Sequence, residues 1–438
     1  MESHERTGGG VNLLKLDITN GPVVVVAYLL TAMLLLVLLV RAFYPWRTGR
    51  VMWNIAGAVI GAGSAIVLMA VLFVWLDAFD GPLELRAIPW IMWGFAALGF
   101  AIRCLWIFRR WFKILPAAAI LSILVSTTLG VNFSYGLTPT LGLFLGLPTS
   151  DVVALPVVSG APQATIGNLE STWTPPADMP ATGVMGRIEG GIPNANSGFG
   201  AREAEIYLPP AARVATPPKL PLIIWMMGKP GYPDPQFVAR ELETFAKDHK
   251  GLAPIVIAVD QLGNPAQDPM CLDSPRGNVE SYFIKDVVPW AQSHLNVTTD
   301  PSQWVIAGYS NGGACATYFG VKYPQIWQNI LAVSGEEYPG FGDGRALKRV
   351  FNSNQNAWEA VKPIALMHDN TFPNTLAVFT TGALDTRYGP GLHKVADAAE
   401  KAGMDVTMID LPGVDHTNDA LIQGLKQGLV PVLERLGL

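Results

Sequence analysis

The sequence predicts two structural parts. The first is a bundle of four membrane-spanning helices, and the second is an α/β domain whose mostly parallel sheet has helices on both faces. Half of the 438 residues are hydrophobic and only 15% are charged, too apolar a balance for an ordinary soluble enzyme. The apolar residues gather in the first third of the chain. Beyond residue 181, short β-branched runs alternate with longer amphipathic stretches, which is the pattern of parallel strands joined by helices.

Four long apolar runs make up the first part. They extend over about Val23 to Val40, Met52 to Leu76, Ile88 to Phe108 and Ile114 to Tyr135. Each is long enough to cross roughly 30 Å of hydrocarbon as a helix. Buried helices of a soluble protein imitate one such run, but four in succession favour a membrane bundle. A cleaved signal peptide is the alternative for the first run, and the absence of a positive leader argues that this run stays in the membrane.

The charges between the runs predict the orientation of the bundle. Basic residues lie between runs one and two and around the junction of runs three and four: Arg41, Arg47, Arg50, Arg103, Arg109, Arg110 and Lys113. The remaining loop carries acidic residues against Arg86: Asp77, Asp80 and Glu84. Because positive loops stay in the cytoplasm, we expect a multi-pass protein of the cell membrane with both chain ends, and everything after Tyr135, outside the cytoplasm.

Composition divides the chain into four segments. Residues 1–21 form an N-terminal extracytoplasmic segment, 22–135 the four helices, 136–180 a linker rich in Pro, Gly, Thr and Ser, and 181–438 the α/β domain. The formal net charge of −5 offers no basic surface for a phosphate backbone, so no nucleic-acid partner is expected. The three cysteines include no Cys-x-x-Cys pair, and no metal site is expected.

The α/β domain is predicted to contain eight strands, with helices between most of the later ones. The strands are Gly183 to Ile188, Ala204 to Leu208, Leu222 to Met227, Ile255 to Val259, Trp304 to Ala307, Ile330 to Val333, Leu376 to Thr380 and Val406 to Ile409. The helices are Gln236 to Lys247, Val279 to His294, Asn311 to Lys322, Gly391 to Ala402 and Asn418 to Leu436.

A nucleophile motif occupies the turn from the fifth strand into its helix. Gly308 and Gly312 flank Ser310 in Gly-x-Ser-x-Gly spacing. Such a turn strains the backbone of the serine and exposes its hydroxyl, while glycines let the strand and the helix approach each other. The backbone amide of Asn311 is then aimed at a developing oxyanion. The motif alone is weakly specific, and the strand before it and the helix after it strengthen it.

A base and an orienting acid follow the serine in the order that this architecture requires. Asp385 comes after the strand LAVFTTG and His416 after the strand VTMIDL. Each lies just past the carboxyl end of a strand, where open parallel sheets place their ligands. We therefore predict Ser310 as nucleophile, His416 as general base and acid, and Asp385 as the residue that orients the imidazole.

Other residues remain as alternatives to these partners. Asp385 would otherwise cap a helix, in which case Glu336 or Glu337, after the strand LAVS, would be the acid. His416 would otherwise be a surface residue, although the other histidines downstream, His368 and His393, do not directly follow a strand.

Two more features of the sequence concern the surroundings of Ser310. The loop Met227 to Gly231 follows the strand LIIWMM, and the backbone amide of Gly228 or Lys229 is the predicted second oxyanion donor. The residues after LAVS, from Glu336 to Arg345 and on to about Ala357, form an insertion that would make a lid.

These residues resemble the esterase family of the α/β-hydrolase superfamily that holds esterase D-like enzymes, feruloyl esterases and antigen 85 mycolyltransferases. The resemblance rests on GYSNG at Ser310, the helix and strand before it, GALD at Asp385 and PGVDH at His416. The four helices before this domain are similar to those of membrane-anchored actinobacterial members. The resemblance implies an α/β-hydrolase fold and an acyl-enzyme mechanism without metal or organic cofactor. The chain departs from the family at two places. Asn311 follows the serine where many members have Met or a small residue, and the segment LIIWMMGKPG around Gly228 lacks the His-Gly pair that is common there.

The cysteines divide by location. Cys271 follows the strand IVIAV and Cys315 lies on the helix after Ser310. In an extracytoplasmic domain a disulfide between them would tie the active-site loop to that helix, and two buried thiols are the alternative. Cys104, inside the third apolar run, is expected to be a free thiol.

Taken together, the sequence predicts a membrane-anchored serine esterase that acts on lipid or cell-envelope esters. The lipid preference follows only from the tether, which raises the local concentration of membrane-borne esters. Two alternatives stay open. One is an acyltransferase that moves an acyl group to a sugar or glycerol hydroxyl, and the other is a catalytically inactive hydrolase-like binding or scaffold module. The sequence predicts no oligomeric state.

Overall fold

The computed structural model describes residues 13–19, 21–44, 48–76, 78, 85–135, 138, 140–147, 149–155, 158, 169–341 and 345–438. The chain divides into two compact units, Met1–Thr149 and Ser150–Leu438, which are described separately. Most of the predicted N-terminal segment and part of the predicted linker lie outside the described residues. The same holds for Arg47 and for the acidic loop residues Asp77, Asp80 and Glu84.

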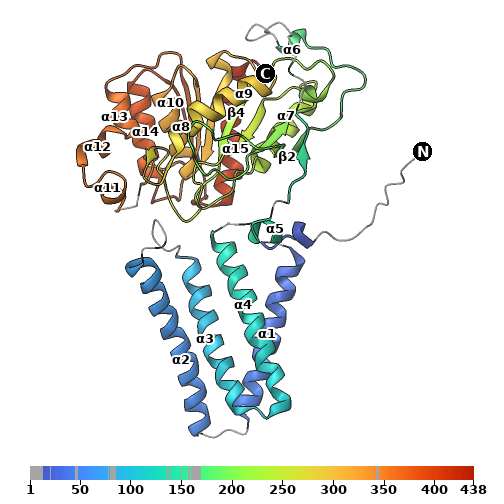
Figure 1. Ribbon diagram of the computed structural model, residues 1–438, viewed down its shortest axis with the longest axis vertical. Helices are drawn as coiled ribbons and strands as arrows, with labels where there is room; N and C mark the ends of the chain where they lie inside the picture. The colour runs from blue at the N-terminus through green and yellow to red at the C-terminus, as the bar shows by residue number, and fades with distance from the viewer. Residues whose placement is uncertain are drawn as a thin grey trace. The chain divides into compact units, whose positions relative to one another are not determined.

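Four long helices dominate the first unit (Figure 1), and each coincides with one predicted apolar run. They are α1 (Pro22–Phe43), α2 (Thr48–Ala70), α3 (Ala87–Ile107) and α4 (Ile114–Tyr135). A π-helical turn, Val71–Trp75, extends α2, and the short elements are Leu13–Lys15, Arg110–Lys113 and α5 (Leu141–Phe144). Within the described residues, four segments are long and apolar enough to cross a membrane: Pro22–Phe43, Thr48–Trp75, Ala87–Ile107 and Arg110–Ser134. This unit therefore associates the protein with a membrane.

Close backbone approach holds the first unit together. A Cβ added to Gly61 of α2 would lie 2.1 Å from the Phe95 carbonyl oxygen of α3, so only glycine fits there. Small residues of this kind let membrane helices pack by van der Waals contact. Between α1 and α4, the Thr31 hydroxyl lies 2.5 Å from Ser122 Oγ and 2.7 Å from Ser126 Oγ. These hydroxyl contacts satisfy polar groups that would otherwise face apolar surroundings.

A nine-stranded sheet forms the centre of the second unit. Its strand order is β1-β2-β3-β5-β4-β8-β9-β10-β11, and the run from β5 to β11 is parallel throughout. The bounds are β1 (Val152–Val153), β2 (Val184–Ile188), β3 (Glu205–Leu208), β4 (Leu222–Met226), β5 (Ile255–Ala258), β8 (Trp304–Tyr309), β9 (Asn329–Val333), β10 (Leu376–Gly382) and β11 (Asp405–Leu411). The strand β3 pairs antiparallel with both β2 and β5. The central strands are buried on both faces, as parallel strands require.

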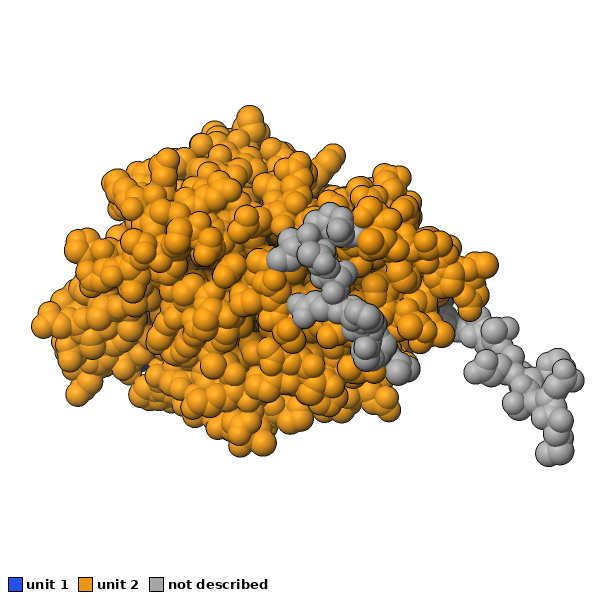
Figure 2. Space-filling view, turned by 90° about the horizontal axis from the view of Figure 1, so that it is seen from above, with its two compact units in different colours: residues 1–149 blue, residues 150–438 orange. Residues whose placement is uncertain are grey.

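Helices cover both faces of this sheet. One face packs against α7 (Gln236–Asp248) and α15 (Asn418–Leu436). The other packs against α10 (Asn311–Lys322), α14 (Gly389–Lys401) and the segment formed by α8 (Val279–Ser281), a π turn (Tyr282–Val287) and α9 (Val288–His294). In the space-filling view of Figure 2, this unit (orange) is one closely packed body. The predicted fold class, a mostly parallel sheet between helices preceded by four apolar helices, is confirmed.

The remaining elements of the second unit are short. They are α6 (Leu169–Thr172), the hairpin β6 (Asp273–Ser274) and β7 (Gly277–Asn278), two 3-10 turns (Pro210–Arg213 and Pro301–Gln303), and α11 (Ala346–Arg349), α12 (Gln355–Ala360) and α13 (Pro363–His368). The predicted lid segment includes α11 and the start of α12, which lie at the left edge of the unit in Figure 1. Residues 342–344 of that segment lie outside the described residues.

Candidate active site

Ser310 lies between β8 and α10 in a conformation that side chains rarely adopt. Its φ is +53° and its ψ is −117°, the strained turn expected of a nucleophile motif. The neighbouring glycines make the turn feasible, because a Cβ on Gly308 would lie 2.3 Å from Gly312 backbone atoms. The Ser310 amide donates to the Val333 carbonyl of β9 at 2.9 Å, which fixes the turn against the neighbouring strand.

The two predicted partners of Ser310 lie within hydrogen-bond distance in series. His416 Nε2 is 2.9 Å from Ser310 Oγ, and His416 Nδ1 is 2.9 Å from Asp385 Oδ2. Ser310 follows β8, Asp385 follows β10 and His416 follows β11. These strands belong to the parallel run β8-β9-β10-β11, so their carboxyl ends bring all three residues to one edge of the sheet. If Nδ1 donates to Asp385, Nε2 is free to accept the serine proton, which is the arrangement that activates a hydroxyl.

The carboxylate of Asp385 is held in its charged form. Burial raises its pKa, but hydrogen bonds from His416 and from the amides of Tyr388 and Arg387 outweigh burial, and the pKa lies below its ordinary value. The side chain is 1% exposed, against 20% for His416. A buried, ionised carboxylate therefore faces an imidazole that remains open to solvent on one side.

Two tyrosine rings position the imidazole of His416. The Tyr309 ring stacks on it at 5.6 Å between centroids, and the Tyr388 ring packs at 4.5 Å with a 44° tilt. The Tyr309 hydroxyl donates to the Thr417 carbonyl at 3.1 Å. The imidazole is thus restrained by ring contacts as well as by Asp385.

The alternative acids and histidines lie elsewhere. His393 Nε2 is 3.0 Å from Asp410 Oδ1 at the exposed end of α14 and β11, and His368 pairs with Asp369 on the surface. Glu337 pairs with Lys394 at 3.4 Å. Asp415 accepts the backbone amide of His416 at 2.8 Å and so shapes the loop that carries the imidazole.

Glu336 follows β9 and lies at the same sheet edge without a hydrogen bond to His416. Burial, and after it the negative charge of Asp268, raises its pKa to about 8, although Lys229 and Arg387 oppose this shift. The carboxyl is therefore largely neutral at pH 7, unlike that of Asp385.

The predicted oxyanion donors border the serine. Asn311 is the first residue of α10, where backbone amides have no partner inside the helix. Gly228 lies against the turn, since a Cβ added to it would be 3.1 Å from the Tyr309 ring and 3.2 Å from Ser310 Cβ. Lys229 is the next residue and precedes Pro230 through a cis peptide bond. The backbone amides of Asn311 and of Gly228 or Lys229 therefore remain the candidate oxyanion donors.

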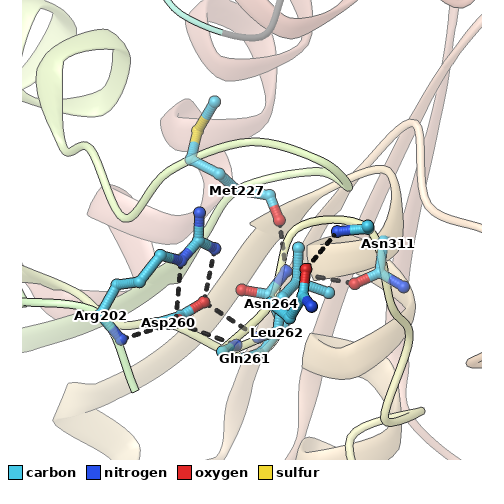
Figure 3. Close-up of polar contacts among 9 residues, drawn as sticks. Arg202, Met227, Asp260, Gln261, Leu262, Asn264 and Asn311 are labelled. Atoms are coloured by element: carbon cyan, nitrogen blue, oxygen red, sulfur yellow. Dashed lines mark hydrogen bonds and ion pairs between the residues drawn. The ribbon is translucent and has the colours of Figure 1, made fainter. Parts of the chain in front are cut away.

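A buried polar network, which the sequence did not reveal, supports this loop (Figure 3). Gln261 Nε2 donates to the Met227 carbonyl and, at 3.1 Å, to Asn311 Oδ1. Asn311 Nδ2 in turn donates to Asp268 Oδ2 at 3.0 Å. Because the carbonyl and the N–H of one trans peptide point in opposite directions, the bond to Met227 also fixes the direction of the Gly228 N–H.

An ion pair holds the loop that carries Gln261. Asp260, fully buried, accepts from Arg202 Nε at 3.0 Å and from an Arg202 terminal nitrogen at 2.6 Å (Figure 3). It also accepts the amides of Leu262 and Gly263. The fork geometry of arginine suits a carboxylate bidentately, so the chain direction just after β5 is strongly determined.

A disulfide follows the Gln261 loop in the chain. Cys271 and Cys315 are bonded, with their Cα atoms 5.6 Å apart, and both side chains are buried. The bond joins the segment after Asp268 to the middle of α10, the helix that begins next to Ser310. Among the described residues Cys104 is the free cysteine, and it is buried in α3.

Part of the chain matches the model of a known protein family, and most of it aligns with one known relative. Residues 200–402 match the model of the family described as "Putative esterase". A Corynebacterium glutamicum protein bearing the name "Uncharacterized protein" is 29% identical over 376 residues, which is 82% of this chain and 85% of that relative.

Solved structures with partial similarity include three hydrolases. A ferulic acid esterase has 16% identity and a TM-score of 0.45, covering 53% of this chain and 92% of its own. An S-formylglutathione hydrolase from Agrobacterium tumefaciens has 19% identity and a TM-score of 0.42, covering 53% and 90%. A fluorophosphonate-binding serine hydrolase from Staphylococcus aureus has 14% identity and a TM-score of 0.42, covering 54% and 92%.

The parallel sheet, the strained serine turn and the family match define the class of this protein as a serine hydrolase of the α/β-hydrolase fold. Within that class, residues 200–402 match the model of an esterase family. The resemblance predicted from the sequence is confirmed for this part of the chain.

Proposed function

We propose that this protein is a membrane-anchored serine esterase. In it, Ser310 attacks the ester carbonyl, His416 takes the serine proton and later returns it to the leaving alcohol, and Asp385 orients and stabilises the imidazole. Water then releases the acid from an acyl-enzyme on Ser310. The catalytic domain, residues 181–438, faces outward from the cytoplasm, and the four helices hold it at the bilayer.

One observation carries this proposal: the two 2.9 Å hydrogen bonds that link Ser310, His416 and Asp385 in series. They join residues from three strand ends, with a base at hydrogen-bond distance from the hydroxyl and an ionised carboxylate behind the base. That geometry is the general requirement for an activated serine. The amides of Gly228 and Asn311 complete it as donors to the oxyanion, each worth about 10²- to 10³-fold in kcat in known sites.

The substrate class follows from the tether. Four apolar helices keep the site near membrane-borne esters, whose effective concentration then far exceeds that of the same ester in solution. Lipid or envelope esters of glycerol or sugar, carrying fatty acyl, mycolyl or aminoacyl groups, are therefore the proposed substrates.

The test is ester hydrolysis by the detergent-solubilised full chain. We expect turnover of short acyl esters to disappear in Ser310→Ala. The matched control is Ser334→Ala. Ser334 is a buried serine of positive φ after the adjacent strand β9, and its hydroxyl has no hydrogen-bond partner among the residues that the structure describes. Equal turnover in Ser310→Ala and the parent would refute the mechanism.

A second arm of the experiment follows the acyl group. Glycerol or a sugar is added, and the products are separated into free acid and new ester. Hydrolysis yields free acid as the main product. If new ester predominates instead, an alcohol rather than water accepts the acyl group, and the protein is an acyltransferase that uses the same triad.

A further inference from the structure

An open groove of about 670 Å³ lies between α2 and α3 in the first unit. Its lining is mostly apolar and includes Ile60, Phe95 and Ile102. Glycines 57, 61 and 99 form its floor, where the two backbones are closest. The volume lies in the range of sites that hold small organic molecules.

The groove contains one charged side chain, Arg103 of α3. Its stem rests on α2, since a Cβ added to Gly57 would be 3.0 Å from Arg103 Cβ. The residue is half-buried, and no hydrogen bond or ion pair joins it to any other part of the chain that the structure describes. A cation beside apolar surface in a membrane span is costly without an anion. The groove therefore lacks the negative partner that its chemistry requires.

The ends of the groove differ in a way that suits a lipid. Trp53 and Trp106 flank the Arg103 end and are 63% and 81% exposed, and tryptophan favours the level of the headgroups. From Arg103 to Phe95 the apolar lining extends about 12 Å along α3, at roughly 1.5 Å per residue. The lining is thus polar and aromatic at the Arg103 end and apolar toward Phe95. The apolar stretch is long enough to hold part of an acyl chain.

We propose that this groove binds one phospholipid with an anionic headgroup. The phosphate contacts the Arg103 guanidinium and one acyl chain lies along the groove toward Phe95. Other basic residues stand at the same end of the bundle, because Arg41 lies in the last turn of α1, Arg50 lies in the first turn of α2 and Arg109 follows α3. Their combined field favours a lipid of net negative charge over a zwitterionic one.

The test is native mass spectrometry of the full chain released from vesicles of phosphatidylglycerol or phosphatidylcholine. We expect a one-to-one adduct with phosphatidylglycerol that is retained at least tenfold better than phosphatidylcholine. Arg103→Gln abolishes the preference, whereas Arg86→Gln, which removes an exposed charge at the opposite end of α3, retains it. Turnover of a soluble ester by the Arg103→Gln protein remains that of the parent, which shows an intact second unit and separates this proposal from the proposed function.

A second variant guards against misfolding of Arg103→Gln. Ile60→Trp fills the groove from a position that is 70% exposed and leaves the guanidinium in place, and we expect it to reduce lipid retention as well. Equal retention of both lipids by the parent would overturn the proposal. So would unchanged phosphatidylglycerol binding in both variants, or a dimer of the chain that Ile60→Trp dissociates, because the groove would then be filled by a second copy.

Discussion

The two units handle polar groups in opposite ways. In the first, hydroxyls such as Thr31 and Ser122 satisfy one another between helices, and the backbones touch at glycines such as Gly61. In the second, buried charges concentrate at one edge of the sheet, where Asp260, Asp268 and Asp385 are each fully hydrogen-bonded or ion-paired. The packing of the first unit thus depends on close fit between helices, and the active-site edge of the second unit depends on charged side chains held in fixed positions.

This contrast teaches where chemistry can be located. Low-dielectric surroundings strengthen every interaction with a charge, and an unpaired buried charge is correspondingly costly. In the second unit, a hydrogen-bonded network keeps the Asp385 carboxylate ionised behind the imidazole that faces the Ser310 hydroxyl. Changes to such networks should therefore affect catalysis or the stability of the second unit while the helices of the first unit remain intact.

The largest expected effect comes from Asp385→Asn. The amide keeps the volume but loses the negative charge that orients and stabilises the imidazole, so kcat on short esters should fall by about 10⁴-fold. Circular dichroism should show the same helix content as in the parent. Asp410→Asn, which alters another aspartate paired with a histidine, is the matched control and should retain full turnover. Equal activities in the two variants would remove Asp385 from the mechanism.

The disulfide should dominate the stability of the second unit. Cys271 and Cys315 are 44 residues apart, and the loss of a crosslink over such a loop costs about 4 kcal/mol in the chain-entropy description. The double variant Cys271→Ser/Cys315→Ser should lower the denaturant midpoint of the second unit but not that of the first. Cys104→Ser is the control, and an unchanged midpoint in the double variant would show that the crosslink contributes little.

Gln261 is expected to act through the direction of the Gly228 amide. Gln261→Ala removes the bonds to the Met227 carbonyl and to Asn311, so one oxyanion donor is no longer held in place. We expect kcat to fall by about 10- to 100-fold with little change in KM, because the lost contact acts mainly on the transition state. Gln355→Ala, on an exposed helix, is the control; a change confined to KM would instead make Gln261 a substrate-binding residue.

The smallest effect concerns Glu336 and depends on pH. Its pKa is about 8 in the folded chain against an ordinary 4.5, so between those values the unfolded chain releases a proton that the folded chain retains. The carboxyl therefore costs stability as pH rises through this window, and fully so above pH 8. Glu336→Gln should be more stable than the parent at pH 9 and equal to it near pH 4 in thermal unfolding. Glu337→Gln is the control, and a difference that is independent of pH would contradict the raised pKa.

Much of this organisation could be predicted from the sequence because it is local. Long apolar runs, alternating strands and helices, and a serine between two glycines each depend on neighbouring residues. Asp385 and His416 could be nominated because each follows a strand that carries an unmistakable β pattern. From the sequence alone, Glu336 or Glu337 could also have been the acid that pairs with His416, since β9 ends at the same edge of the sheet. The loop after β10 distinguishes Asp385 from them, because the amides of Arg387 and Tyr388 donate to its carboxylate and hold it toward the imidazole.

What could not be predicted is non-local. The contacts of Gln261 with Met227 and of Asn311 with Asp268 join residues 34 and 43 positions apart, and no motif marks either pair. The Arg202–Asp260 ion pair spans 58 positions. The two-residue strand β1 is too short for any alternation to be visible. These features arise only when the loops at the carboxyl edge of the sheet fold over one another.

The most direct test of the central claim is covalent labelling of the full chain with a fluorophosphonate, followed by mass mapping of the modified peptide. If His416 activates Ser310, the adduct forms on Ser310, and the rate of labelling falls at least a hundredfold in His416→Ala. An adduct on another residue, or the same labelling rate in the parent and in His416→Ala, would contradict the account.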